Sequence, residues 1–263
     1  MDWPAELTEA LGPGRILGPL GGGVHRAEVS GSTIVVKSTG AARDEAAGLG
    51  RLAAAGARGG PRVPAVLYCG DGILALEWVA SGPPTAGSEE RLGRALAGLH
   101  SVTEPEWGGG SPWIGDCAVD PSPHATAAGF YGFRLDELAR RCGLEEPVGR
   151  MVERLPELIP PGPPSLLHGD LWWGNVLWPV AGDRPAVIDP SVHAGHPEED
   201  LAMLALFGPV PGPTMDAYQE TRPLPEGWQQ RVGMWQTYPL LVHTVLFGGA
   251  YRAQVIDRLR RYS

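Results

Sequence analysis

The sequence predicts an α+β fold with two lobes around a cleft. Its first 80 residues alternate short strand-like runs with Gly and Pro, whereas helix-like segments dominate after residue 88. Residues 80–88 form a connector of mostly small residues between these parts. The change in composition places a small antiparallel β-sheet lobe with one helix at 1–79 and a larger, mainly helical lobe at 89–263.

Five runs in the first lobe are rich in apolar residues and lie among Gly and Pro residues, which is typical of strands. They cover residues 15–20, 24–30, 32–38, 65–71 and 73–79. The predicted helix lies between the third and fourth runs, at 41–56, where Leu49 and Leu52 follow Glu45 at about helical spacing.

The second lobe carries several segments with helical periodicity. They cover residues 89–102, 134–143, 148–159 and 240–263. A further helix opens around Asp200, and the Pro-rich stretch 159–165 predicts a rigid approach to a strand or a catalytic turn.

Charge and composition exclude several classes of protein. The net charge is −9 and no run of basic residues interrupts it, which disfavours nucleic-acid or anionic-membrane partners. No apolar stretch is long enough for a membrane-spanning helix, and the N-terminus lacks a signal-peptide core, so we expect a cytoplasmic protein. Three cysteines at unrelated spacings suggest neither a disulfide framework nor a zinc cluster.

Lys37 is the only lysine in the chain. The chain has 21 lysine and arginine residues in total, and all the others are arginine. It lies near the end of the strand-like run 32–38. A compact ammonium differs from a planar guanidinium in ways that phosphate-binding sites exploit. Lys37 is therefore a candidate functional residue. The alternative interpretation is that this lysine remains by chance in a chain whose composition favours arginine.

Gly21, Gly22 and Gly23 join two strand-like runs. A glycine hairpin of this kind lets the backbone lie close over a ligand and direct its amides at phosphates. The glycines are consecutive and a strand follows them, so the dinucleotide-binding fingerprint is absent. An ordinary turn is the alternative interpretation.

Glu45 follows Lys37 by eight residues, on the predicted helix. A strand lysine and a helix glutamate can form the ion pair that kinase-like sites use to hold nucleotide phosphates. Asp44 competes with Glu45, but adjacent helical positions point about 100° apart, so only one of the two faces the cleft. The alternative is a solvated helix start with favourable acidic residues.

The stretch "LLHGDLWWGNVLWPVAGDRPAVIDP", residues 166–190, contains the most specific pattern. Asp170 can accept a hydroxyl proton, and Asn175 and Asp189 offer oxygen ligands to Mg²⁺. Their order and spacing match the catalytic loop and metal-binding aspartate of protein kinases, with HGD in place of HRD and DPS in place of DFG.

Two segments, "LLHGDLWWGN" and "VIDPSVHAGHPEEDLAMLALFG", resemble the fructosamine kinase (ketosamine-3-kinase) family. This family is a branch of the protein-kinase-like fold, beside aminoglycoside and choline phosphotransferases. The similarity also includes "GGGVHRAEV", "VVKS", the 41–56 helix and residues 217–255, so it covers nearly the whole chain.

The resemblance implies a role for each matching residue. Asp170 would be the catalytic base, and Asn175 and Asp189 the Mg²⁺ ligands. Lys37 would bind the ATP phosphates with Glu45 as its partner. The backbone from Glu77 to Val79 would hydrogen-bond the nucleotide base.

Other residues near the motif are expected to support the site or to contact the sugar. His168 is expected to support the catalytic loop as a buried histidine, and Asp200 to hold the loop backbone or to cap its helix. Trp172 is a candidate aromatic wall for a sugar. His193 and His196 resemble a metal pair only superficially, because further ligands are lacking.

Two departures from the family pattern affect the prediction. Val24 stands where some members carry a cysteine in the glycine-rich loop, so thiol regulation there is not implied. The substrate-side segment 106–138 is unusually rich in Gly and small residues, which leaves the acceptor preference open.

The predicted function is an ATP- and Mg²⁺-dependent kinase that phosphorylates a sugar hydroxyl of a ketosamine, most simply O3, and thereby starts deglycation. An aminoglycoside- or choline-type kinase is the second hypothesis. A nucleotide-binding pseudokinase that serves as a scaffold is the third. The sequence leaves the oligomeric state, the amine and the sugar open.

Overall fold

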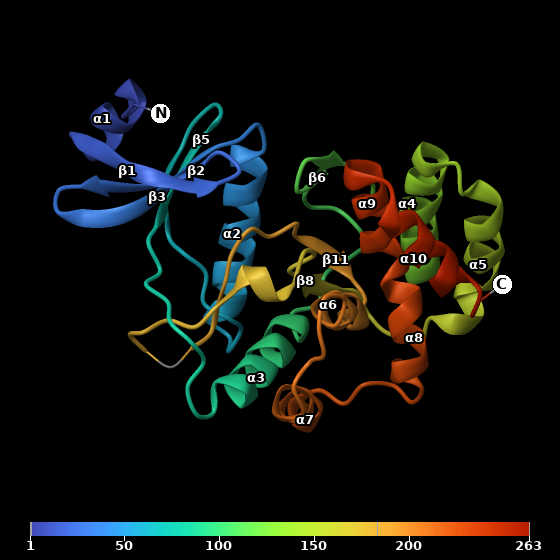
Figure 1. The fold of residues 1–263 in the computed structure, drawn as a ribbon. Coiled ribbons are helices and arrows are strands. Elements are labelled where there is room, and N and C mark those ends of the chain that lie inside the picture. The colour runs from blue at the N-terminus through green and yellow to red at the C-terminus, as the bar shows by residue number, and fades with distance from the viewer. Residues whose placement is uncertain (1, 183, 263) are drawn as a thin grey trace.

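The first lobe is built on a five-stranded antiparallel sheet with the strand order β1-β2-β3-β5-β4. A computed structural model describes residues 2–182 and 184–262. The strands are β1 (Gly14–Gly21), β2 (Val24–Val29), β3 (Ser32–Ser38), β4 (Val66–Cys69) and β5 (Ile73–Glu77). Every strand predicted from the sequence is present, and the sheet lies at the left of Figure 1.

Two helices cover opposite faces of this sheet. Because side chains alternate along a strand, neighbouring residues of β5 face opposite ways. Ala75 packs with Leu7 of α1 (Ala5–Leu11), whereas Leu74 and Leu76 pack with Leu49 of α2 (Ala42–Gly56). Helix α2 was predicted; α1 is a short additional helix.

The rest of the chain is mainly helical. Its helices are α3 (Ser88–His100), α4 (Ala127–Cys142), α5 (Glu145–Leu158), α6 (Pro197–Leu204), α7 (Gly212–Thr221), α8 (Trp228–Trp235), α9 (Thr237–Phe247) and α10 (Ala250–Leu259). One apolar core joins α3 and α7 to the segments around the site, and another joins α4, α5 and α8–α10. Figure 1 shows the second group at the right, far from the sheet.

Short strand pairs between these helices position the site. They are β6 (Trp113–Ile114) with β7 (Cys117–Ala118), β8 (Ser165–Leu167) with β11 (His193–Gly195), and β9 (Val176–Leu177) with β10 (Ala186–Val187). All three pairs are antiparallel. Each pair holds two loops side by side. Residues that are far apart in the sequence can therefore lie close together at the site.

The fold class is confirmed, with one correction to the elements. The single helix predicted at 240–263 is wrong, because Gly248 and Gly249 both have positive φ and separate α9 from α10. Helices α7 and α8 were not predicted. The lobe boundaries at residues 79 and 89 stay a prediction. Within the described ranges, no helix is both long and apolar enough to cross a membrane.

Candidate active site

Asp170 lies in a loop that follows strand β8, and the loop is held from below by Asp200. The Asp200 carboxylate accepts hydrogen bonds from the backbone amides of His168 at 2.8 Å and Gly169 at 2.9 Å. Gly169 has φ 81°, and a Cβ there would collide with the Ser191 carbonyl oxygen. The sequence HGD therefore needs glycine in its middle position because the two loop backbones approach closely.

Asn175 and Asp189 are brought together by the β9–β10 hairpin. Asn175 directly precedes β9, Asp189 comes two residues after β10, and the Ile188 amide donates to the Asn175 carbonyl at 3.0 Å. The Asn175 side-chain amide donates to the Asp170 carbonyl at 2.9 Å. The hairpin thus explains how residues fourteen positions apart face the same cavity as Asp170.

Lys37 reaches this group from the sheet. Its ammonium lies 2.6 Å from a Glu45 carboxylate oxygen and also pairs with Asp189. The residue is only 8% exposed. Burial alone would lower the pKa of Lys37, but the carboxylates of Asp189 and Glu45 outweigh it and raise the pKa, so the ammonium stays charged. Glu45, and not Asp44, is therefore the partner.

Asp170 has a strongly perturbed acidity. Burial raises its pKa from 3.8 to about 7, with further contributions from the negative charges of Asp189 and Asp200. The hydrogen bond from Asn175 acts in the opposite direction. A carboxylate whose pKa lies near neutrality is suited to accept a proton from a hydroxyl group.

The glycine turn between β1 and β2 lies beside the group formed by Lys37, Asp170, Asn175 and Asp189. Gly21, Gly22 and Gly23 have φ values of 111°, 53° and 77°, a conformation that residues with a Cβ rarely adopt. Gly22 and Val24 line the polar cavity that also contains Lys37, Asp170, Asn175 and Asp189. This cavity has a volume of about 330 Å³.

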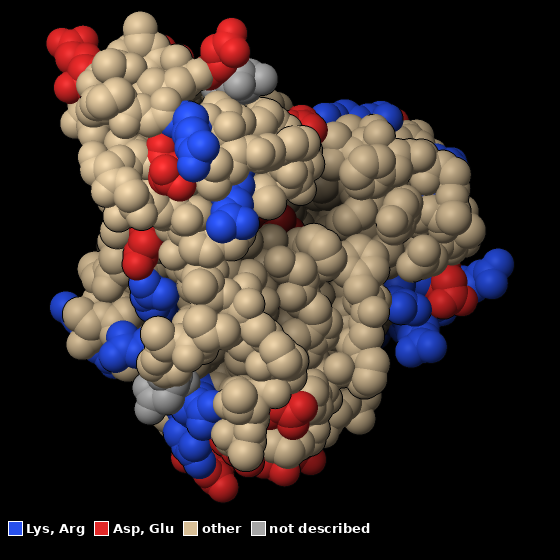
Figure 2. Space-filling view, turned by 60° about the vertical axis from the view of Figure 1, so that its left-hand side comes forward, with Lys and Arg blue, Asp and Glu red and all other residues tan. Residues whose placement is uncertain are grey.

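A second cavity of about 470 Å³ lies between the glycine turn and the connector. Apolar side chains from both lobes line it, including Val35, Leu76, Leu177 and Ile188. Lys37 and Asp189 line both cavities, so the two adjoin at this ion pair. Figure 2 shows a hollow with acidic atoms in its depth, surrounded by a largely uncharged surface.

Glu77 and Val79 lie on the wall of this second cavity. The Glu77 carboxylate pairs with Arg62 and accepts from the Ala65 amide at 3.2 Å, so it is engaged by the segment that precedes β4. The Glu77 backbone amide is also engaged, because it donates to the Ala65 carbonyl at 2.9 Å. Among the described residues, no hydrogen bond uses the backbone amide of Val79.

Trp172 and His168 take different places around Asp170. Trp172 is 39% exposed and lines the polar cavity together with Asp170. His168 is fully buried, and its Nε2 lies 3.0 Å from the carbonyl oxygen of Ile188, the residue before Asp189. Burial lowers the pKa of His168, so a neutral ring donates to that carbonyl.

His193 and His196 lie apart from the cavities that Lys37 and Asp170 line. His196 accepts from the Glu198 amide, caps helix α6 and stacks on Trp235 at 5.2 Å between ring centroids. His193 is buried, with its Nε2 2.9 Å from Arg134 Nη1. Both histidines therefore support the fold.

Sequence reasoning missed the buried residues that support Asp200 and the loop of Asp170. His100 Nε2 lies 3.2 Å from Asp200, and its Nδ1 lies 2.8 Å from the Tyr218 hydroxyl. Arg134 and Glu199 form a second buried pair at 3.5 Å. His100 falls on the apolar face of its helix. A polar residue at such a position was the signal in the sequence that could have predicted a buried hydrogen-bond partner.

Comparison with known proteins identifies the family to which a chain with this arrangement belongs. Residues 37–262 match the family model described as fructosamine kinase. The chain belongs to the fructosamine kinase family. A probable ketoamine kinase from Thermus thermophilus is 34% identical over 250 residues, which is 92% of this chain and 91% of that protein. The resemblance predicted from the motifs is confirmed, and the chain is a phosphotransferase of the kinase type.

Solved structures support the same assignment. A proposed fructosamine-3-kinase from Thermobifida fusca superposes with a TM-score of 0.86 at 37% identity, over 98% of this chain and 97% of that one. A choline kinase from Streptococcus pneumoniae, in complex with AMP, gives a TM-score of 0.67 at 14% identity, over 98% and 96% of the two chains. The second likeness shows the shared kinase-like fold.

Proposed function

We propose that this member of the fructosamine kinase family transfers the γ-phosphoryl group of ATP to a sugar hydroxyl of a ketoamine. The observation that carries the proposal is the meeting of Lys37, Asp170, Asn175 and Asp189 around one polar cavity. A phosphoryl-transfer site works mainly by positioning and by neutralising charge, and these four side chains supply both.

The nucleotide has a matching place beside this cavity. The apolar cavity between Val35, Leu76 and Ile188 suits a flat base, and the unused Val79 amide can donate to it. From there the triphosphate would run under the glycine turn toward Lys37. The raised pKa of Lys37 keeps its charge available for the phosphates.

Asn175 and Asp189 have the donor atoms that Mg²⁺ prefers. Asp189 has a carboxylate and Asn175 a side-chain carbonyl oxygen, and kinases commonly complete the octahedral shell with phosphate oxygens and water. The Asn175 amide nitrogen is engaged with Asp170, which leaves its carbonyl oxygen to serve as a ligand. When bound there, Mg²⁺ would neutralise phosphate charge. Asp189 would then exchange part of its contact with Lys37 for the metal.

Asp170 would accept the proton of the attacking hydroxyl as the oxygen bonds to phosphorus and ADP leaves. In a ketoamine, phosphorylation of the O3 hydroxyl would lead to release of the amine. Loss of a C1 proton from the 3-phosphate gives an enaminol, and the nitrogen lone pair then expels phosphate from C3. Water hydrolyses the resulting C=N bond and releases the free amine, which is deglycation.

The runner-up is an aminoglycoside or choline acceptor. Aminoglycosides carry several positive charges, and a site for them needs several carboxylates on the acceptor side. Here Asp116 joins Asp170 on that side of the polar cavity, while the neighbouring cavity is apolar. The complete set of catalytic side chains likewise disfavours a pseudokinase.

The test is to incubate the protein with MgATP and a defined fructosyl- or ribulosyl-amine, to locate the phosphate by NMR and to follow release of the amine. Phosphate on O3 followed by amine release is expected. Rapid turnover of an aminoglycoside or choline, without phosphorylation of any ketoamine, would overturn the proposal.

A further inference from the structure

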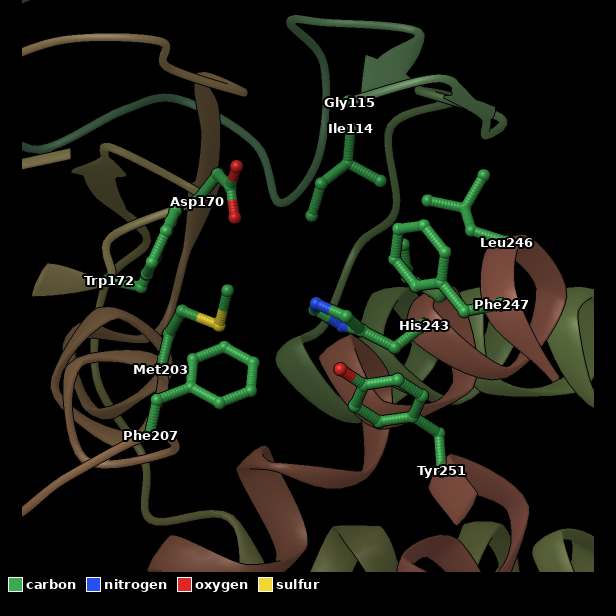
Figure 3. Close-up of a pocket in the computed structure, with 11 residues that line it drawn as sticks. Ile114, Gly115, Asp170, Trp172, Met203, Phe207, His243, Leu246, Phe247 and Tyr251 are labelled. Atoms are coloured by element: carbon green, nitrogen blue, oxygen red, sulfur yellow. The ribbon is translucent and has the colours of Figure 1, made fainter. Parts of the chain in front are cut away.

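A third cavity opens on the acceptor side of Asp170. Its volume is about 370 Å³, and it lies between the segment around α6 and the α9–α10 pair (Figure 3). Asp170, Trp172 and Gly115 line both this cavity and the polar one, so the two meet at the catalytic carboxylate. A molecule with its hydroxyl at Asp170 can therefore extend into it.

The wall of this cavity is apolar and aromatic. Ile114, Met203 and Leu246 line it together with Phe207, Phe247 and Tyr251. Among its described lining residues, Asp170 is the only one with a formal charge, and it lies at the mouth. A ligand group with a charged far end would lose hydration there without gaining a partner.

Exposed aromatic side chains gather around this cavity from separate parts of the chain. Trp172 follows the catalytic residue, Phe207 follows α6, and Phe247 ends α9. Phe207 is 49% exposed and Phe247 67% exposed. Large apolar side chains left open in one place commonly mark a surface that a ligand covers.

His243 holds this wall together. Its Nδ1 donates to the Pro239 carbonyl at 2.6 Å, which fixes the ring. The ring lies 5.4 Å from Phe207, 5.7 Å from Phe247 and 4.9 Å from Tyr251, measured between centroids. The aromatic groups thus form a connected surface that is in place before any acceptor arrives.

We propose that this cavity binds the substituent on the amine of the ketoamine and selects aromatic or branched aliphatic substituents without a charge at the far end. The inference rests on the proposed function. The amine of a ketoamine is only a few bonds from O3, so with O3 at Asp170 the substituent lies at the cavity mouth. The alternative ligands for this cavity are substituents with a positively charged end, because aromatic ring faces can bind cations.

The test compares three ketoamines with the same fructosyl group, made from methylamine, benzylamine and 1,4-diaminobutane. The benzyl compound should exceed the methyl compound in kcat/KM by about tenfold or more, because an apolar pocket rewards added buried carbon. The diaminobutane compound should not exceed the methyl compound. A preference for the diaminobutane compound would overturn the proposal in favour of cation binding.

Variants connect the selectivity to the cavity. Phe247→Ala should reduce the benzyl-to-methyl ratio of kcat/KM toward one, and Phe247→Glu should shift the preference toward the diaminobutane compound. Ile256→Ala is the matched control, since Ile256 is a 36% exposed apolar residue on neighbouring α10 that does not line the cavity. It should keep the wild-type ratio. Thermal melting verifies that each variant is folded.

Two negative results have different meanings. Efficient phosphorylation of all three ketoamines with equal kcat/KM, or an unchanged ratio in Phe247→Ala, would overturn the inference and leave the proposed function standing. No phosphorylation of any of the three would remove the proposed function and the inference together.

Discussion

Lys37 and Asp189 form an ion pair across the cleft although 152 positions separate them along the chain. Lys37 belongs to the sheet of the first lobe, and Asp189 follows a hairpin of the second. Asp189 has φ 55°, a left-handed conformation that aspartate tolerates better than most residues. The pair joins the two parts of the chain at the point where phosphates are expected.

Lys37→Arg should lower kcat/KM for ATP by about 100-fold or more. The ammonium is buried between two carboxylates, and a longer, planar guanidinium does not fit the same place. Steady-state kinetics with varied MgATP provide the measurement. Arg43→Lys alters an exposed ion pair with Asp71 and should leave kcat/KM near the wild-type value. Near-normal kinetics in Lys37→Arg would show that the single lysine is an accident of composition.

Asp189→Asn should leave the protein folded and abolish metal-dependent turnover. The variant keeps the shape of the side chain but removes the charge that attracts a divalent cation. Titration of Mg²⁺ in the activity assay, with circular dichroism for folding, provides the measurement. Unchanged turnover at saturating MgATP would refute the assignment of Asp189 as a metal ligand.

Asp170→Asn should lose turnover by about 1,000-fold or more while still binding MgATP. The carboxylate is expected to act on the acceptor hydroxyl, and an amide cannot take its proton. Calorimetric titration with a non-hydrolysable ATP analogue measures binding separately from catalysis. Equal losses of nucleotide affinity and turnover would place Asp170 in nucleotide binding instead.

The activity should rise with pH through about 7, the pKa of Asp170. Below this pH the carboxyl group is protonated and cannot act as a base, so kcat/KM for the acceptor should fall about tenfold per pH unit. The measurement is made at saturating MgATP. Histidines titrate in the same range, so His25→Asn, which changes a half-buried histidine beside the glycine turn, is the control and should retain the same pH profile.

His100→Phe should lower the free energy of unfolding by about 3 kcal/mol, because it removes a partner from the fully buried Asp200. Burial alone would raise the pKa of Asp200, but His100 and the hydrogen bond from the Gly169 amide lower it. Denaturant unfolding measures the change. We also expect a lower kcat at temperatures where the variant is folded. Stability within 0.5 kcal/mol of wild type, on the order of a surface substitution, would contradict the proposed support.

The sequence by itself was sufficient for the fold class, the five strands and the polar residues that the structure brings together around one cavity. Strand and helix periodicities are local properties, and the spacing of Asp170, Asn175 and Asp189 reflects one loop and one hairpin. The choice of Glu45 over Asp44 needed the structure, because two adjacent helical residues differ only in which neighbour they face.

Tertiary structure alone decided what surrounds the loop that contains Asp170. The contact of His100 with Asp200 spans 100 positions, and the aromatic cavity combines segments that include Ile114, Phe207 and Tyr251. The raised pKa of Asp170 likewise depends on burial and on carboxylates brought close by folding. Packing and electrostatic interactions act through space, so the order of residues along the chain does not reveal them.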